Sequence, residues 1–267
     1  MLSFNLIFFL FITYVAYLGI CDRCCLINRH KLPPYNLIKI NSCSGQPIIS
    51  RRMVSSVNKC EEFAASKRAL AFNFISARNY TDKRENSCQA LECPEDYNMT
   101  TLVPETDCTY YSMYPIVTLP ANATMQCLPK AGIFLFSFEH LNYTDARNFC
   151  QKRNGSLAHV ISEERTEGLG KFVSHNISRF IGLSSESKER IWKNEFGEPL
   201  SCFDYRAWGE GQPSHSKGCA VLANPSAKSS PPFWQVMPCH TSLPFICEIS
   251  PLPDESSKQR SKNHHHT

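Results

Sequence analysis

The sequence lacks the motifs on which the main enzyme classes depend. Among its 267 residues there is no Gly-x-Ser-x-Gly nucleophile elbow, no His-Glu-x-x-His pattern and no glycine-rich phosphate loop. It also lacks an imbalance of charge, because its formal net charge is only +4. Proteins that bind nucleic acid through their electrostatic field usually carry a much stronger positive charge. The sequence therefore predicts neither an enzyme nor a nucleic-acid-binding protein.

Long apolar runs are also scarce, and the clear one stands at the N-terminus. Residues 2–20, LSFNLIFFLFITYVAYLGI, contain no charged side chain and are long enough for a signal peptide or a membrane anchor. Gly19 and Cys21 supply the small residues of a cleavage site before Asp22. Basic residues after the run disfavour an anchor that displays the rest of the chain outside the cell. We predict a signal peptide at residues 1–21, secretion into the extracellular space, and contact with a membrane only if this segment stays uncleaved.

Sequons and cysteines agree with entry into the secretory pathway. Asn-x-Ser/Thr sequons stand in both halves of the chain, at Asn79, Asn98, Asn122, Asn142, Asn154 and Asn176. The 14 cysteines include no C-x-x-C pair followed by a matching second pair, which disfavours a zinc site. In an oxidising compartment such cysteines form disulfides. The expected product is a disulfide-bonded, secreted glycoprotein.

The chain divides into two compact segments, both of α+β type. A polar lead at residues 22–42 precedes the first segment, residues 43–111. A connector at residues 112–126 contains two prolines and a sequon, and it is predicted to be an exposed linker. The second segment spans residues 127–249. The polar tail at residues 250–267 has no aromatic residue and is predicted to be disordered.

The first segment combines a helix with an aromatic strand. Val57, Cys60 and Phe63 follow the spacing of an amphipathic helix, and LAFNF at residues 70–74 alternates as a strand does. This order of elements resembles a PAN/apple domain over residues 43–111. The alternative is an unrelated α+β module held by disulfides, because small cysteine-rich scaffolds recur in many families.

The resemblance to PAN/apple domains implies two disulfides. The implied pairs are Cys60–Cys88, from helix to strand, and Cys43–Cys108, at the ends of the module. Ala64 and Leu70 stand where the family has a further pair. Because both cysteines of that pair are missing together, the loss leaves no reactive thiol behind.

The second segment begins with two predicted helices. In NYTDARNFCQKRNG we expect Thr144 as the N-cap of the first helix and Gly155 as its end. Ser162 is expected to cap the second helix, with Glu163 and Glu164 in its first turn. The sequence RFIGLSS then predicts a strand.

These landmarks resemble a C-type lectin-like domain across residues 127–249. GSLAHV, FIGL and FICE stand where the family has a Gly-x-Leu-Ala strand, a Trp-Ile-Gly-Leu strand and its closing motif, with Phe180 in place of the tryptophan. The resemblance implies two helices, an antiparallel sheet and a long loop region. It also implies the disulfides Cys150–Cys247 and Cys219–Cys239. On the chain-entropy model the first of these stabilises the fold by about 4–5 kcal/mol.

Apart from Cys21 in the predicted signal peptide, five cysteines receive no partner from these resemblances. They are Cys24, Cys25, Cys93, Cys127 and Cys202. Long members of the lectin-like family carry an extra N-terminal pair, of which only Cys127 is present here. A Cys127–Cys202 bridge is one option, but connectivity does not follow from sequence.

The loop EGQPSHSKGC at residues 210–219 decides whether calcium is expected. Sugar-binding members of the family hold calcium with Glu or Gln, then Pro, then Asn or Asp, joined by an acidic residue before the next cysteine and an Asn-Asp pair after a later tryptophan. Gln212 and Pro213 match the first two positions. The other positions hold Ser214, Lys217, Gly218, Gln235 and Val236, and none of these offers a carboxylate. Calcium takes about 6–8 oxygen ligands, several of them from carboxylates, so we predict a lost calcium site and no cofactor.

The resemblances indicate binding rather than catalysis. We expect a secreted protein whose lectin-like domain binds an extracellular protein or glycan without calcium, with the PAN-like module as a second interaction surface. The alternative is a calcium-dependent galactose-type lectin, which Gln212 and Pro213 alone suggest. Trp192, Trp208 and Trp234 are expected to pack in the core or beneath loops.

Overall fold

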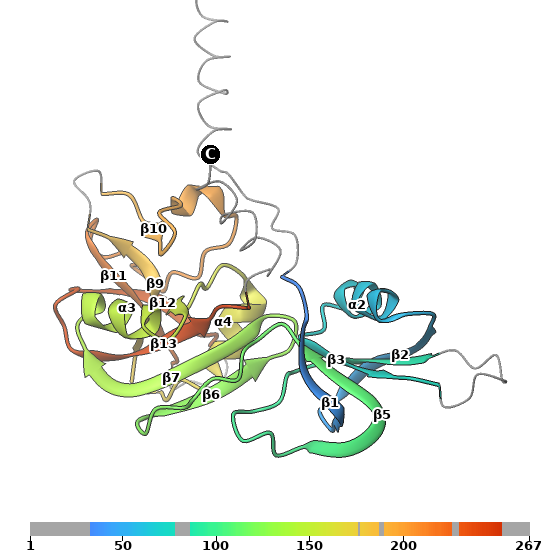
Figure 1. Ribbon diagram of the computed structural model, residues 1–267. Helices are drawn as coiled ribbons and strands as arrows, with labels where there is room; N and C mark the ends of the chain where they lie inside the picture. The colour runs from blue at the N-terminus through green and yellow to red at the C-terminus, as the bar shows by residue number, and fades with distance from the viewer. Residues whose placement is uncertain (1–32, 78–85, 176, 187–189, 226–229, 253–267) are drawn as a thin grey trace, which may run out of the picture.

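The computed structural model describes residues 33–77, 86–175, 177–186, 190–225 and 230–252. Within these ranges the chain forms two modules that lie side by side (Figure 1). No described helix is long and apolar enough to cross a bilayer. The predicted signal peptide, Asn79, Asn176 and most of the predicted tail lie outside the described residues.

The N-terminal module is an antiparallel sheet crossed by one helix. Its elements are β1 (Asn36–Ser44), β2 (Ile48–Val54), α2 (Val57–Ser66), β3 (Ala71–Ile75), β4 (Asn86–Leu91) and β5 (Leu102–Ser112). The strands are ordered β1-β5-β3-β4-β2. The predicted helix and aromatic strand are therefore present as α2 and β3. The predicted polar lead is shorter than expected, because β1 already begins at Asn36 and pairs with β5.

Helix α2 is held to the sheet by apolar packing and one disulfide. The Ser56 side chain accepts a hydrogen bond from the Lys59 backbone N–H and caps its first turn. Cys60 lies on the buried face of the helix and is joined to Cys88 of β4. Ala64, one of the two positions where the PAN/apple resemblance implied a missing cysteine, is fully buried in this core.

The C-terminal module is built on a larger, mostly antiparallel sheet. Its elements are β6 (Ala123–Leu128), β7 (Gly132–Leu141), α3 (Tyr143–Gln151), β8 (Gly155–Leu157), α4 (Glu163–Gly170), β9 (Arg179–Ser185), β10 (Lys193–Asn194), η1 (Leu200–Cys202), β11 (Gly218–Ala223), β12 (Phe233–Met237) and β13 (Leu243–Ile249). The main path runs β12-β11-β9-β13-β7-β6, with β10 paired to β9 and β8 paired to β13.

The two helices of the C-terminal module cover opposite faces of this sheet. On one face Tyr143 of α3 meets the Phe180 ring of β9 edge-on, with ring centroids 5.4 Å apart. On the other face Leu169 of α4 packs in a cluster with Ile181, the next residue of β9. This alternation follows from the two-residue period of a strand.

Two details of the helix ends differ from the sequence prediction. Asn142, rather than Thr144, caps α3, because its side chain accepts the Asp145 N–H at 2.9 Å. The helix ends at Gln151, and Gly155 instead begins β8. Both Asn and Thr are good N-caps, and tertiary packing decides between them. The cap of α4 at Ser162 is confirmed.

The predicted connector at 112–126 is not an exposed linker throughout. Met113 and Tyr114 are only 4% and 7% exposed, and β6 begins at Ala123. Tyr114 lies against Gly132, where a β-carbon would stand 2.8 Å from the tyrosine oxygen. The prediction of a disordered tail is wrong for residues 250–252, because the Leu252 N–H donates to the Met113 carbonyl at 2.7 Å. Burial of apolar side chains outweighs the turn-rich composition here.

A disulfide between Cys93 and Cys127 joins the two modules. Cys127 belongs to β6 of the C-terminal module, and Cys93 follows β4 of the N-terminal module. The pairing excludes the Cys127–Cys202 option. Cys202 is itself disulfide-bonded, and its partner lies outside the described residues.

Candidate functional site

The candidate calcium loop is anchored beside strand β12. The Trp234 N–H donates to the Ala207 carbonyl at 2.6 Å, and the Gly209 N–H donates to the Trp234 carbonyl at 3.0 Å. These two bonds hold the chain entering the loop parallel to β12. The loop therefore starts from a fixed base, where a ligand-binding side chain can be held in place.

Gln212 turns its side chain inward and ties the loop to β12. Its Oε1 atom accepts the backbone N–H of Val236 at 2.9 Å and that of Ser214 at 3.2 Å. The peptide bond between Gln212 and Pro213 is cis. Gln212 is half-buried, whereas Ser214 and Lys217 are exposed. The structure thus joins the Gln212 side chain to the Val236 backbone. The sequence suggested these residues only as positions of a calcium site, and not as hydrogen-bond partners.

The donors that remain at this loop are few. The Val236 side chain is buried and apolar, and the Lys217 ammonium is exposed on the loop itself. Among the described residues, one group of acid and cysteine side chains is close enough to share a metal ion, and it consists of Glu186 with Cys219 and Cys239. Those two sulfurs are joined in a disulfide and are not thiolate ligands.

Three tryptophans support the loop from below. Trp208 meets Trp192 and Trp234 edge-on, with ring centroids 4.9 Å and 5.4 Å away. Tyr205 meets Trp234 on another side at 5.7 Å. Trp234 is fully buried and the other two tryptophans pack against the same core, so the predicted packing role agrees with the structure.

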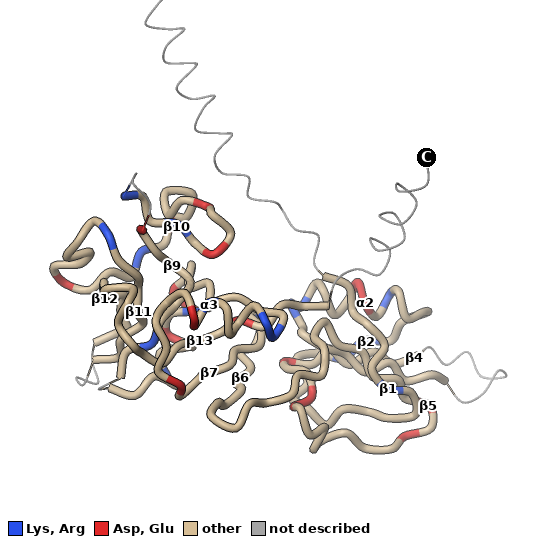
Figure 2. Tube along the Cα trace, turned by 60° about the vertical axis from the view of Figure 1, so that its left-hand side comes forward, with Lys and Arg blue, Asp and Glu red and all other residues tan. Residues whose placement is uncertain are grey.

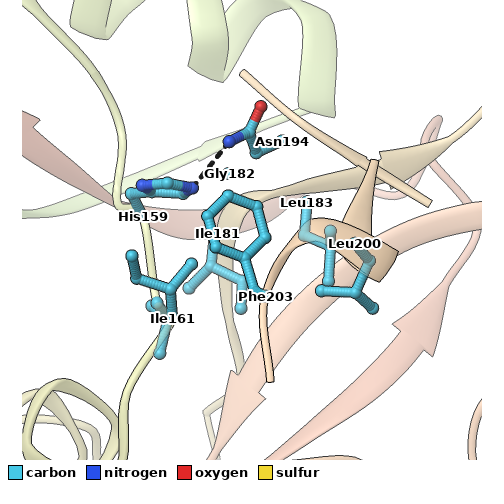
Figure 3. A pocket seen from close by; sticks show the side chains of 9 residues that line it. His159, Ile161, Ile181, Gly182, Leu183, Asn194, Leu200 and Phe203 are labelled. Carbon is cyan, nitrogen blue, oxygen red and sulfur yellow. Dashed lines mark hydrogen bonds between the residues drawn. The ribbon is translucent and has the colours of Figure 1, made fainter. Parts of the chain in front are cut away.

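A histidine and an asparagine fix the neighbouring loop that follows β10. Figure 3 shows the Asn194 amide pointing at the His159 ring, with 2.7 Å between Nδ2 and Nε2. The Asn194 Oδ1 atom accepts the N–H groups of Phe196 and Glu198, so the amide nitrogen must face the histidine. His159 Nε2 is therefore a hydrogen-bond acceptor, which requires a neutral ring. Burial lowers the pKa of His159 in agreement with this state.

The space beside His159 is not a ligand cavity. It measures about 10 Å³ and is lined by apolar side chains, among them Ile181, Leu183, Leu200 and Phe203 (Figure 3). This is no more than one water molecule requires. His159 instead lies edge-on to the rings of Phe196 and Phe203. Sequence reasoning did not identify the pair with Asn194, because the two residues stand 35 positions apart without a shared motif.

An ion pair fastens α4 to the last strand beneath this region. The Arg165 guanidinium donates to both carboxylate oxygens of Glu248, at 2.8 Å and 2.9 Å. Glu248 also accepts the His159 backbone N–H at 3.0 Å. Arg165 further donates to the carbonyls of His159 and Ala131. Such bidentate pairs are geometrically specific as well as strong.

The four disulfides implied by the two resemblances are all present. Cys150–Cys247 and Cys219–Cys239 lie in the C-terminal module, and Cys43–Cys108 and Cys60–Cys88 lie in the N-terminal module. Of the sequon asparagines, Asn98, Asn122 and Asn154 are exposed, and Asn142 is the half-buried cap of α3.

Comparison with known proteins gives the following matches. The model of the lectin C-type domain matches residues 139–249. A C-type lectin mannose-binding isoform from Notechis scutatus scutatus is 29% identical over 146 residues, which are 50% of this chain and 90% of the relative. C-type lectin BfL-2 from Bungarus fasciatus is 29% identical over 128 residues, or 45% of this chain and 79% of the relative. The carbohydrate-recognition domain of the mouse scavenger receptor C-type lectin is 27% identical, with a TM-score of 0.40, and covers 50% of this chain and 99% of that structure.

Proposed function

We propose, from the premise that residues 139–249 form a C-type lectin domain, that this chain is an extracellular binding protein whose lectin domain recognises a protein or glycan without calcium. The observation that carries the proposal is the position of Gln212. Its side-chain oxygen accepts the N–H groups of Val236 and Ser214. An oxygen between two N–H dipoles is a poor ligand for a cation, because the positive ends of both dipoles already face it.

The rest of the loop supports the same conclusion. Calcium needs about 6–8 oxygens, and carboxylates supply the charge that offsets its dehydration. Ser214 offers one neutral hydroxyl and Val236 a hydrocarbon side chain. Lys217 adds a positive charge on the exposed part of the loop. These side chains do not fit a calcium ion, so we propose that ligand recognition proceeds without it and without a catalytic step.

Secretion is part of the proposal and rests on covalent chemistry. Disulfides such as the one between Cys150 and Cys247 persist in oxidising compartments and are rare in the cytosol. The exposure of Asn98, Asn122 and Asn154 leaves these sequons accessible for glycosylation. The apolar segment at residues 2–20 supplies an export signal.

We also propose a PAN/apple-like identity for the N-terminal module, with a role as a second binding surface. The observation in support is the link from helix α2 to strand β4 through Cys60–Cys88, within a module closed by Cys43–Cys108. The disulfide Cys93–Cys127 keeps this module attached to the lectin domain. Two tethered surfaces bind one ligand more tightly than either alone when both can reach it.

The alternative is a calcium-dependent lectin of the galactose type. It rests on Gln212 and Pro213, and one relative carries mannose binding in its name. The test is to probe the secreted protein against a glycan array and a library of extracellular domains, each in calcium and in chelator. We expect at least one ligand with equal signal in both conditions. Retention on galactose or mannose resin that chelator releases contradicts the proposal, and so does the absence of any ligand.

A further inference from the structure

Arg179, the first residue of β9, is a buried cation that no carboxylate of the described residues accompanies. Only 2% of the residue is exposed. One terminal nitrogen, Nη1, donates to the Ser137 carbonyl, and the buried Nε has no hydrogen-bond partner. No carboxylate of the described residues lies within ion-pair distance of it. Burial lowers the pKa of Arg179, as expected for a desolvated charge.

Two partly buried arginines of the same module, Arg165 and Arg147, are paired with carboxylates, whereas the half-buried Arg153 lies over the Phe149 ring and donates to the Phe149 carbonyl. Arg165 meets Glu248 in a bidentate contact, with 18% of its side chain exposed. Arg147 donates to both oxygens of Glu195, with 33% of its side chain exposed. Arg179 is more buried than any of these, and no carboxylate of the described residues pairs with it. A desolvated charge is costly without a counter-charge, which indicates that its partner comes from another molecule.

Aromatic rings around Arg179 form an exposed patch. The Arg179 guanidinium carbon lies 5.0 Å from the Phe138 ring centroid and 5.8 Å from that of Phe136. Phe136 in turn packs against Phe172, with centroids 5.6 Å apart. Phe138 is 52% exposed and Phe172 is 40% exposed. The exposed Phe138 ring thus lies over the buried guanidinium, and the exposed Phe172 ring adjoins it through the buried Phe136.

The buried Arg179 is not part of a larger block of positive charge in the described part of the chain. Figure 2 shows basic and acidic residues interspersed over both modules, without one continuous block of either sign in the described part of the chain. Lys171, the neighbour of Phe172 in the sequence, is exposed, whereas Glu139, the neighbour of Phe138, is half-buried. The feature specific to the patch is therefore a single buried guanidinium under an exposed ring.

We propose that Phe138, Phe172 and Arg179 form a docking surface for a protein partner that presents a Glu or Asp side chain among apolar residues. The partner's apolar side chains cover the two phenylalanines, and its carboxylate reaches the guanidinium as the Phe138 ring swings aside. A charge-assisted hydrogen bond in this dry setting is stronger and more selective than one at an open surface. The inference rests on the proposed binding function and names the face and the partner chemistry.

A matched pair of peptides tests the surface on the full glycosylated chain. The first is a capped peptide with Glu between leucines, and the second has Gln at that position. We expect the Glu peptide to bind about tenfold more tightly, as one charge-assisted bond predicts. Arg179→Gln should abolish this preference and Arg179→Lys should keep part of it. Phe138→Ser should weaken both peptides, whereas Phe196→Ser, which changes a 68% exposed ring outside the patch, should weaken neither.

Several results would overturn the inference. They include equal binding of the two peptides, a Glu preference that survives Arg179→Gln, and a loss with Phe196→Ser equal to that with Phe138→Ser. A covering glycan is a distinct result, because the Phe138 N–H donates to the carbonyl of the sequon residue Asn122 at 2.9 Å. Binding that emerges only in Asn122→Gln would overturn the inference for the native protein, because the chain's own glycan would then occupy the patch. Failure of these tests leaves calcium-independent ligand binding intact, which the array measures separately.

Discussion

The side-chain oxygen of Gln212 and the backbone N–H of Val236 lie 2.9 Å apart and join the loop to strand β12. In sugar-binding relatives of the fold, both of these sequence positions are expected to serve a metal ion. In this protein the residues at these two positions are joined by a hydrogen bond from the Val236 backbone N–H to the Gln212 side-chain oxygen. This neutral hydrogen bond holds the loop against the strand, and it supports our proposal that the loop needs no cation.

Calcium should leave the stability of the protein unchanged. A ligand that binds only the folded state raises stability by about 2.7 kcal/mol at a hundredfold excess over its Kd. We therefore expect equal melting temperatures in millimolar calcium and in chelator. Ser214→Asp should not create a calcium effect, because Lys217 and Val236 remain. Scanning fluorimetry measures the melting temperature. A rise of several degrees in calcium would contradict the prediction that the calcium site is lost.

Acidification should weaken the fold through His159. Its pKa is lowered by burial, so below the ordinary histidine pKa of about 6.5 the unfolded chain takes up protons before the folded chain does. This contribution to stability is present above that pH and is lost as the pH falls toward the lower folded pKa. Melting temperatures at pH 7.5 and 5.0 should differ less in His159→Gln, which keeps an acceptor for Asn194 but does not titrate. An unchanged pH dependence would exclude His159 as the source.

Breaking the pair between Arg165 and Glu248 should destabilise the lectin domain. Arg165→Met leaves a carboxylate about one-fifth exposed and unpaired, and we expect a loss of about 2–4 kcal/mol in the free energy of unfolding. Arg179→Met is the matched control, because it removes a buried arginine that has no carboxylate partner. Its expected cost is about 1 kcal/mol or less. Denaturant unfolding of both variants measures the two free energies of unfolding. Equal losses in Arg165→Met and Arg179→Met would contradict the prediction that the paired arginine matters more for stability.

Cys60→Ala and Cys88→Ala should destabilise the protein by the same amount. Their sulfurs form one disulfide, so each variant removes the same bond, and the double variant should be no worse than either single one. The expected loss is about 2–4 kcal/mol. Reductant-free melting curves of the three variants measure it. Clearly additive losses would show that the two residues are not partners.

One cysteine per mature chain should remain outside the internal disulfides. Eleven described cysteines are disulfide-bonded, so 14 − 11 = 3 stand elsewhere. Loss of Cys21 with the signal peptide and pairing of Cys202 outside the described residues account for two of them. Thiol titration should find one free thiol, or non-reducing electrophoresis should find a linked dimer. A fully paired monomer would indicate cleavage at another site.

Local sequence chemistry determined much of the fold. The spacing of Val57, Cys60 and Phe63 predicted α2, because a helix buries one face in 3.6-residue steps. Ser162 with Glu163 predicted the start of α4, because these residues satisfy the free N–H groups of a first turn. The absence of carboxylates at the calcium positions likewise needed only the residue types.

Tertiary structure decided what depends on distant contacts. The pairing of Cys93 with Cys127, the burial of Met113 and Tyr114, and the contact between Gln212 and Val236 each join parts of the chain that no local period relates. Sequence spacing does not rank such contacts, since many pairings satisfy the same residue types. The isolation of Arg179 belongs to the same class. The sequence shows that residue 179 carries a positive charge. Only the tertiary structure shows that Phe136 and Phe138 pack around its guanidinium and that the buried Nε has no hydrogen-bond partner.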